Sequence, residues 1–255
     1  MLTKDQVKFY KDNGFIKLSN IFTDAEIKEI SEEYDDLFKR KKSTGLRAEW
    51  QGNEMKKAAN QEPVTVLSIH NLQFHSDVFT RLIMNKNLLD ALECIMDTPN
   101  ILLHHTKAHL KPPENGAPYL MHQHSMVAAF INLDDSSPEN GGLCVYPGSH
   151  KLGPLEDVGV IEKGEAFHYV DPKIYPISKA TPIEAKKGDV IVFSYLLLHG
   201  SYLNTSERVR RMFLIQLMNA EDDPVEDVHK SPAQGMVLRG KNVRRDATMA
   251  TRFVK

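Results

Sequence analysis

Two histidines separated by a single residue are the first candidates for chemistry. His122 and His124 lie in residues 119–124, which have the pattern of a strand end. Because side chains alternate between the two faces of a strand, residues two positions apart project from the same face. Two neutral imidazoles placed in this way can bind one divalent metal ion. The same spacing also occurs by chance, so the pair predicts a metal site only together with further residues.

A third histidine follows the longest apolar segment of the chain. Residues 190–198 are almost wholly apolar and lead directly into His199, Gly200 and Ser201. This order predicts a histidine held at the mouth of a cavity that a β-sheet builds. Farther along, Arg210 starts another strand-like segment. Its guanidinium can form a bidentate pair with a carboxylate, and the Ser201 hydroxyl can donate a hydrogen bond to the same group.

Simpler interpretations exist for the arginine and for the other histidines. Arg208, Arg210 and Arg211 can form a solvated basic cluster, although strand alternation turns Arg210 and Arg211 to opposite faces. The remaining histidines are interpreted as surface or packing residues. They are His70, His75, His104, His105, His109, His150, His168 and His229.

The composition is that of an ordinary globular protein. The chain has 255 residues, of which 41% are hydrophobic and 26% charged, so it can bury a sizeable core. The 32 Lys and Arg residues nearly balance the 34 Asp and Glu residues, which disfavours binding to nucleic acid or to an anionic membrane. No apolar run approaches the ~20 residues that cross a bilayer. With two cysteines and no targeting signal, we predict a cytoplasmic protein.

The elements that must position these residues change in character near residue 100. Before it, pairs such as Thr3 with Gln6 indicate capped amphipathic helices, and residues 14–18 alternate like a short strand. After it, short strand-like runs alternate with turn sequences. Helices followed by many strands are typical of an α+β fold, mainly β, built as a sandwich or open barrel.

We predict that this fold forms one domain. It would cover residues 1–255, with a helical part over about 1–99 and a β-core over about 100–220. No repeat of fixed period and no convincing linker divides the chain.

These motifs together resemble the phytanoyl-CoA dioxygenase family of iron(II)- and 2-oxoglutarate-dependent oxygenases. The resemblance runs from about residue 5 to residue 219 and includes the histidine and arginine motifs described above. Its other parts are Asn13-Gly14-Phe15, Lys111-Pro112-Pro113, Leu133-Asp134-Asp135, Glu139-Asn140-Gly141-Gly142-Leu143, the motif from Pro147 to Gly153, and Lys187-Gly188-Asp189. The family implies a double-stranded β-helix, or jelly roll, with a site of two histidines and one carboxylate for iron.

The resemblance assigns roles to individual positions. It implies that His122 and His199 bind iron(II), and that Arg210 anchors the distal carboxylate of 2-oxoglutarate with help from Ser201. It also implies O2 as the second cosubstrate. His124 stands where the family has an aspartate. We therefore predict a three-histidine iron site formed by His122, His124 and His199.

His124 leaves four accounts open. The chain can be a working three-histidine oxygenase, a weakened or inactive metal protein, an engineered Asp-to-His variant, or a sequence that lacks a short segment after Gln123. In the last account His124 is not a ligand. A neutral imidazole makes the site one unit more positive than a carboxylate does, but imidazole still suits iron. A side chain of this size also leaves no room for a halide, which disfavours halogenation.

The predicted activity is hydroxylation of a small molecule with release of succinate and CO2. The alternatives are a three-histidine dioxygenase that works without 2-oxoglutarate and a metal- or cofactor-binding jelly roll without turnover. A set of basic residues favours an anionic substrate if it lines the entrance, whereas a solvated surface is the competing interpretation. These residues are Lys107, Lys111, Arg239, Lys241, Arg244 and Arg245.

Overall fold

The computed structural model describes residues 2–41, 67–113, 119–122, 126–162, 165–222 and 231–243. Its α-helices are α1 (Lys4–Asn13), α2 (Asp24–Lys41), α4 (Asp77–Ile83) and α5 (Lys86–Met96). Short 3-10 helices are η2 (Leu72–Phe74), η3 (Ser149–Leu152) and η4 (Ile177–Lys179). None of the helices in these ranges is long and apolar enough to cross a membrane.

The strands form two principal antiparallel sheets in the described part of the chain. The larger sheet has the order β1-β10-β5-β12-β3-β13, with β2 also paired to β3, and the smaller has the order β4-β11-β6-β9. The first sheet uses β1 (Phe15–Leu18), β2 (Leu67–His70), β3 (Ile101–Lys111), β5 (Val127–Asn132), β10 (Val190–Phe193), β12 (Arg210–Asn219) and β13 (Val237–Arg239). The second uses β4 (Tyr119–His122), β6 (Leu143–Val145), β9 (Thr181–Pro182) and β11 (His199–Ser201), while β7 (Val160–Glu162) and β8 (Glu165–Phe167) pair with each other.

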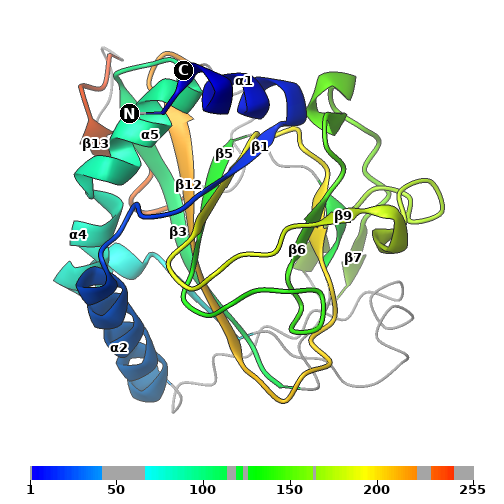
Figure 1. Cartoon of the computed structure of the whole chain (residues 1–255), viewed down its shortest axis with the longest axis horizontal. Coiled ribbons are helices and arrows are strands. Elements are labelled where there is room, and N and C mark those ends of the chain that lie inside the picture. Colours follow the sequence, from blue (N-terminus) through cyan, green and yellow to red (C-terminus); the bar gives the residue numbers. More distant parts are fainter. Residues whose placement is uncertain are drawn as a thin grey trace.

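The arrangement of these layers is a jelly roll of the α+β class. The helices lie along the outer side of the larger sheet, and the smaller sheet lies across the interior from it (Figure 1). The fold class expected from the sequence is confirmed. Strands also come from outside residues 100–220, because β1, β2 and β13 all join the larger sheet.

Local sequence signals explain where α1 begins and ends. The Thr3 hydroxyl accepts a hydrogen bond from the Gln6 amide at 3.2 Å, and the Gln6 side chain accepts one from the Thr3 amide at 2.9 Å. This reciprocal pair satisfies two amides that have no partner inside the helix. Gly14 then ends the helix with φ 80°, a conformation that glycine adopts without steric strain.

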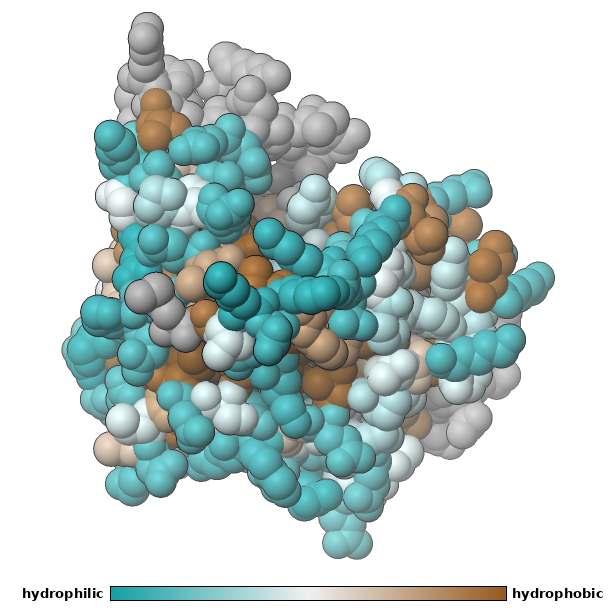
Figure 2. Space-filling view, turned by 45° about the horizontal axis from the view of Figure 1, so that its top comes forward, coloured by the Kyte–Doolittle hydropathy of each residue, from teal (hydrophilic) through white to brown (hydrophobic). Residues whose placement is uncertain are grey.

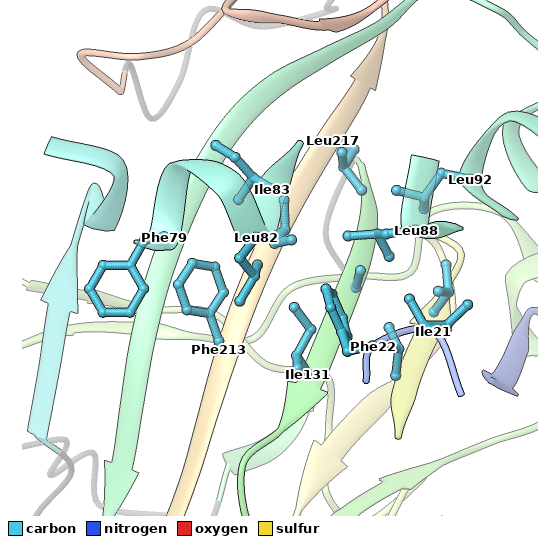
Figure 3. Packing of buried hydrophobic residues seen from close by; sticks show 14 of the residues in the cluster. Ile21, Phe22, Phe79, Leu82, Ile83, Leu88, Leu92, Ile131, Phe213 and Leu217 are labelled. Carbon is cyan, nitrogen blue, oxygen red and sulfur yellow. The ribbon is translucent and has the colours of Figure 1, made fainter. Parts of the chain in front are cut away.

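Strand β12 separates two regions of the core. Its Phe213 and Ile215 side chains point outward to the helices, where the Phe213 ring lies 5.6 Å from that of Phe79 on α4 (Figure 3). Met212 and Leu214 belong to the second cluster, between the two sheets. The alternation of a strand therefore gives β12 one face for the helices and one for the interior.

Figure 2 shows one face of the outer surface. Hydrophilic side chains cover most of the face in Figure 2, with apolar patches between them. Scattered apolar residues on a surface are normal and do not by themselves mark a binding site. The candidate site is instead found between the sheets.

Candidate active site

His199 is the best defined of the three predicted iron ligands. It begins β11, is 3% exposed, and its ring lies 4.5 Å from the ring of Phe193 between centroids. Its Nδ1 donates a hydrogen bond to the carbonyl of Leu197 at 2.8 Å. Because a carbonyl can only accept, this contact fixes the tautomer and makes Nε2 the nitrogen with the lone pair that a metal ion needs.

For the other two predicted ligands, the structure describes only the backbone of one. Strand β4 ends at His122, whose Cα is the register partner of His199 on the neighbouring strand β11. His124 lies outside the described residues. Within the described ranges, no group of three His, Cys, Asp or Glu side chains is arranged to hold a metal ion. The structure thus brings together two of the three predicted positions, through the backbone.

The Arg210 guanidinium is buried, and part of it has no hydrogen-bond partner. Arg210 begins β12, is only 2% exposed, and its Nε and Nη2 atoms are buried without a hydrogen-bond partner. Together these two nitrogens form one edge of the guanidinium, the kind of edge that binds a carboxylate with two parallel hydrogen bonds. Burial lowers the pKa of Arg210 to about 10, which still leaves it charged at neutral pH. A buried charge of this kind is costly until an anion pairs with it.

Ser201 is connected to this region through Lys111, the register partner of Arg210. It is 3% exposed and stands two residues after His199, so the two share a face of β11. Its Oγ lies 2.7 Å from the Nζ of Lys111, which donates to it. Ser201 therefore belongs to a buried polar cluster with Lys111, and its pairing with the same carboxylate as Arg210 stays a prediction.

Lys111 corrects the interpretation of the basic set. The sequence left an entrance or a solvated surface open for Lys111, but the structure buries it to 1% exposure. Its register partner on β12 is the buried Arg210, and both face the interior. Burial lowers the pKa of Lys111 well below its usual value, and the nearby Arg210 lowers it further. Strand alternation through His109 and Lys111 was the signal that could have indicated this position.

The rest of the basic set does not form one surface among the described residues. Arg239 makes ion pairs with Asp90 and Glu93 on α5, and Lys241 follows β13 on the surface. Lys107 is partly buried on β3. Arg244 and Arg245 lie outside the described residues. An entrance lined by all six residues is therefore wrong as a single feature.

Two other positions behave as packing residues. His109 is fully buried, and its Nδ1 lies 3.2 Å from the Tyr119 hydroxyl and 3.3 Å from the Ser68 hydroxyl. Burial lowers the pKa of His109 well below its usual value, so the ring is neutral. His150 donates from Nε2 to the carbonyl of Lys11 at 3.1 Å and thereby contacts the end of α1.

Comparisons with known proteins point to one family. The model of the phytanoyl-CoA dioxygenase (PhyH) family matches residues 10–212. The peroxisomal phytanoyl-CoA dioxygenase of Bos taurus is 29% identical over 228 residues, which is 83% of this chain and 67% of the relative. The probable alpha-ketoglutarate-dependent hypophosphite dioxygenase of Stutzerimonas stutzeri is 26% identical over 235 residues, covering 87% and 80%.

Solved structures agree with the fold. EctD from S. alaskensis with bound Fe superposes with a TM-score of 0.70 at 18% identity, over 94% of this chain and 87% of that one. The epimerase SnoN in complex with Fe3+ and alpha ketoglutarate gives 0.67 at 17% identity, over 94% and 96%. The match of the family model extends over most of the chain and includes the positions of His122, His199 and Arg210. The chain belongs to the phytanoyl-CoA dioxygenase family and is an iron(II)- and 2-oxoglutarate-dependent dioxygenase.

Proposed function

We propose that this protein hydroxylates a small molecule and couples the reaction to the conversion of 2-oxoglutarate into succinate and CO2. The observation that carries the proposal is the unpaired edge of the buried Arg210 guanidinium. Its register partner Lys111 donates a hydrogen bond to Ser201. A dicarboxylate has one end that fits this edge and another that can reach a metal ion. When bound, iron and 2-oxoglutarate supply the oxidising chemistry with O2, and the protein supplies orientation and exclusion of water.

We assign the iron to His122, His124 and His199. The support is the register of β4 and β11, which places the backbone of His122 directly opposite that of His199. The Leu197 carbonyl holds the His199 ring in the orientation described above. Phe193 and Leu214 line the same interior with apolar surface that excludes water.

The role of His124 can be tested by one exchange. If three imidazoles form the working site, His124→Asp changes the charge of the metal site and lowers turnover. Iron binding is retained in that variant, because a carboxylate is also a good ligand for iron. A rise in succinate formation after the exchange would instead mark His124 as a disabling change and would remove it from the ligand set.

We further propose that the substrate is a small anion. Lys107 and Lys111 lie on one face of β3, because they are four positions apart, and the exposed His70 on β2 is the register partner of Lys107. The ring of His70 also lies 4.9 Å from that of His105 between centroids. A relative bears a name that refers to an anion, hypophosphite. Burial lowers the pKa of His70 to about 4, so the positive charge on this face comes from the lysines. Positive charge attracts and orients anionic ligands.

The test of the proposed function is succinate formation. Purified protein with ferrous iron, 2-oxoglutarate and O2 should form succinate, and a panel of small acids should stimulate that formation when it contains the substrate. Oxygen consumption that needs iron but not 2-oxoglutarate would favour the cosubstrate-independent alternative. Iron binding without either reaction would reduce the protein to a metal-binding jelly roll.

A further inference from the structure

Two buried cations stand next to each other at one end of the interior. Lys111 ends β3, Arg210 begins β12, and the two are register partners. In the described part of the chain, neither cation has a carboxylate as a hydrogen-bond partner. A ligand that binds here lowers the electrostatic energy only if it carries a negative charge.

The hydrogen bonds of Lys111 constrain the Ser201 hydroxyl. The Nζ of Lys111 donates to Ser201 Oγ at 2.7 Å, to the Tyr202 carbonyl at 2.7 Å and to the Gly141 carbonyl at 3.3 Å. A bound carboxylate favours the protonated form of this lysine. An ammonium group has three hydrogens and no lone pair, so in that form Ser201 is the acceptor. The hydroxyl hydrogen of Ser201 then points to a different acceptor.

The surrounding chain is shaped to admit this lysine. Gly141 has φ 79°, and a Cβ at this position would lie 3.0 Å from the Lys111 Cδ and 2.9 Å from the Tyr202 carbonyl oxygen. Only glycine allows this loop to close over the lysine side chain without displacing it. The Tyr119 ring lies 5.3 Å from the Nζ on another side. Lys111 is thus enclosed by β4, β11 and the loop before β6.

We propose that Lys111 is a positioning residue for the distal carboxylate of 2-oxoglutarate. It holds Ser201 so that the hydroxyl donates to the carboxylate paired with Arg210, and it adds a second positive charge to that end of the cavity. This inference rests on the proposed function, because it concerns the cosubstrate of the same site. In this proposal, Lys111 acts on the carboxylate through its hydrogen bond to Ser201 and through its positive charge.

Direct binding measurements test this role. We would titrate ferrous protein without oxygen in a calorimeter with 2-oxoglutarate and with 2-oxopentanoate, which has the same keto-acid end but a methyl group in place of the distal carboxylate. Lys111→Met should weaken the binding of 2-oxoglutarate by about tenfold or more, the range for a hydrogen bond to a charged group. Binding of 2-oxopentanoate should not change. Lys111→Gln, which keeps a donor but no charge, should give an intermediate loss.

A double-mutant cycle tests whether Lys111 acts through Ser201. Ser201→Ala should weaken the binding of 2-oxoglutarate, and the addition of Lys111→Met should then cause less loss than it does alone, because the two residues share one interaction. Lys28→Met is the control, since this side chain on α2 is 74% exposed and should bind both probes as the wild type does.

The outcomes separate the two proposals. If Lys111→Met and Lys111→Gln bind 2-oxoglutarate like the wild type, the role of Lys111 is refuted while the proposed function stands. If these variants lose both probes to the same extent, Lys111 only maintains the structure of the cavity and the inference is also wrong. If the wild type itself does not bind 2-oxoglutarate, the proposed function fails.

Discussion

Arg210 and Arg211 are neighbours in the sequence but have opposite environments. Arg211 donates to Asp134 at 2.6 Å and to Asp35 at 2.7 Å on the outer face. The hydrogen bond that Arg211 donates to Asp134, with the charge of that carboxylate, raises the pKa of Arg211. Arg210 faces the interior with two unpaired nitrogens. Consecutive residues of a strand face opposite sides of the sheet, so the sequence alone predicts that Arg210 and Arg211 have opposite environments.

Removal of the Arg210 side chain should act on the cosubstrate. Arg210→Ala should raise the KM for 2-oxoglutarate by about a hundredfold, since two hydrogen bonds between charged groups are lost. Arg208→Ala is the matched control, because Arg208 is 61% exposed and pairs only with Glu139 at 3.4 Å in the described structure. Initial rates of succinate formation measure both variants. Equal KM values for the two would exclude Arg210 as the anchor.

The burial of Lys111 could not be predicted from its residue type and its neighbours in the sequence. A lysine in a stretch of charged and polar residues is normally solvated, because burial of a lone ammonium group is unfavourable. Here it is buried because β3 pairs with β12, a strand almost a hundred residues farther along the chain. The acceptors of its three hydrogen bonds come from two other segments. None of these contacts is local, so the sequence did not reveal them.

At the scale of elements, local signals were the most informative. The capping pair at Thr3 and Gln6 predicts the start of α1, and the alternation of residues 14–18 predicts a strand; both are confirmed. The partners of the strands could not be predicted in the same way. Strand β1 pairs with β10, far along the chain, because it completes the edge of a sheet whose other strands come from the β-core. Which strands pair is decided by the packing of the complete hydrophobic core, not by the sequence of either strand alone.

The contact between helices and the larger sheet should dominate stability. Phe213→Ala removes a fully buried ring that packs on Phe79, and we expect a loss of about 3–5 kcal/mol in the free energy of unfolding. Phe74→Ala is the control, because Phe74 is 63% exposed and should change the free energy by about 0.5 kcal/mol or less. Urea unfolding measures both. Equal effects would show that this contact does not support the fold.

At the scale of the whole molecule, the interior of the jelly roll is basic. Lys111 and Arg210 are buried there together with the neutral His109, and the two faces of the larger sheet separate them from the acidic residues that pair with Arg211. An interior with this sign of charge favours anionic ligands. It also makes the stability of the ligand-free protein depend on pH.

His109 gives that dependence a definite sign. Its folded pKa lies well below 6.5 because of burial, so between the folded pKa and 6.5 the unfolded chain binds more protons than the folded protein. Stability should therefore fall as the pH drops below 6.5, by at most about 1.4 kcal/mol per pH unit from this group. We expect a smaller fall between pH 7 and pH 5 for His109→Gln than for the wild type in urea unfolding. A slope that is the same in both would contradict the assignment.

The central claim is that one interior site binds iron through His199 and 2-oxoglutarate through Arg210. Its most direct test is an anaerobic titration of the ferrous protein with 2-oxoglutarate, followed by visible absorption. We predict a weak charge-transfer band that saturates at one equivalent, is lost in His199→Ala, and is retained in His168→Ala, which changes an exposed histidine beside Asp157. No band at saturating iron and 2-oxoglutarate, or a band that persists unchanged in His199→Ala, would contradict the account.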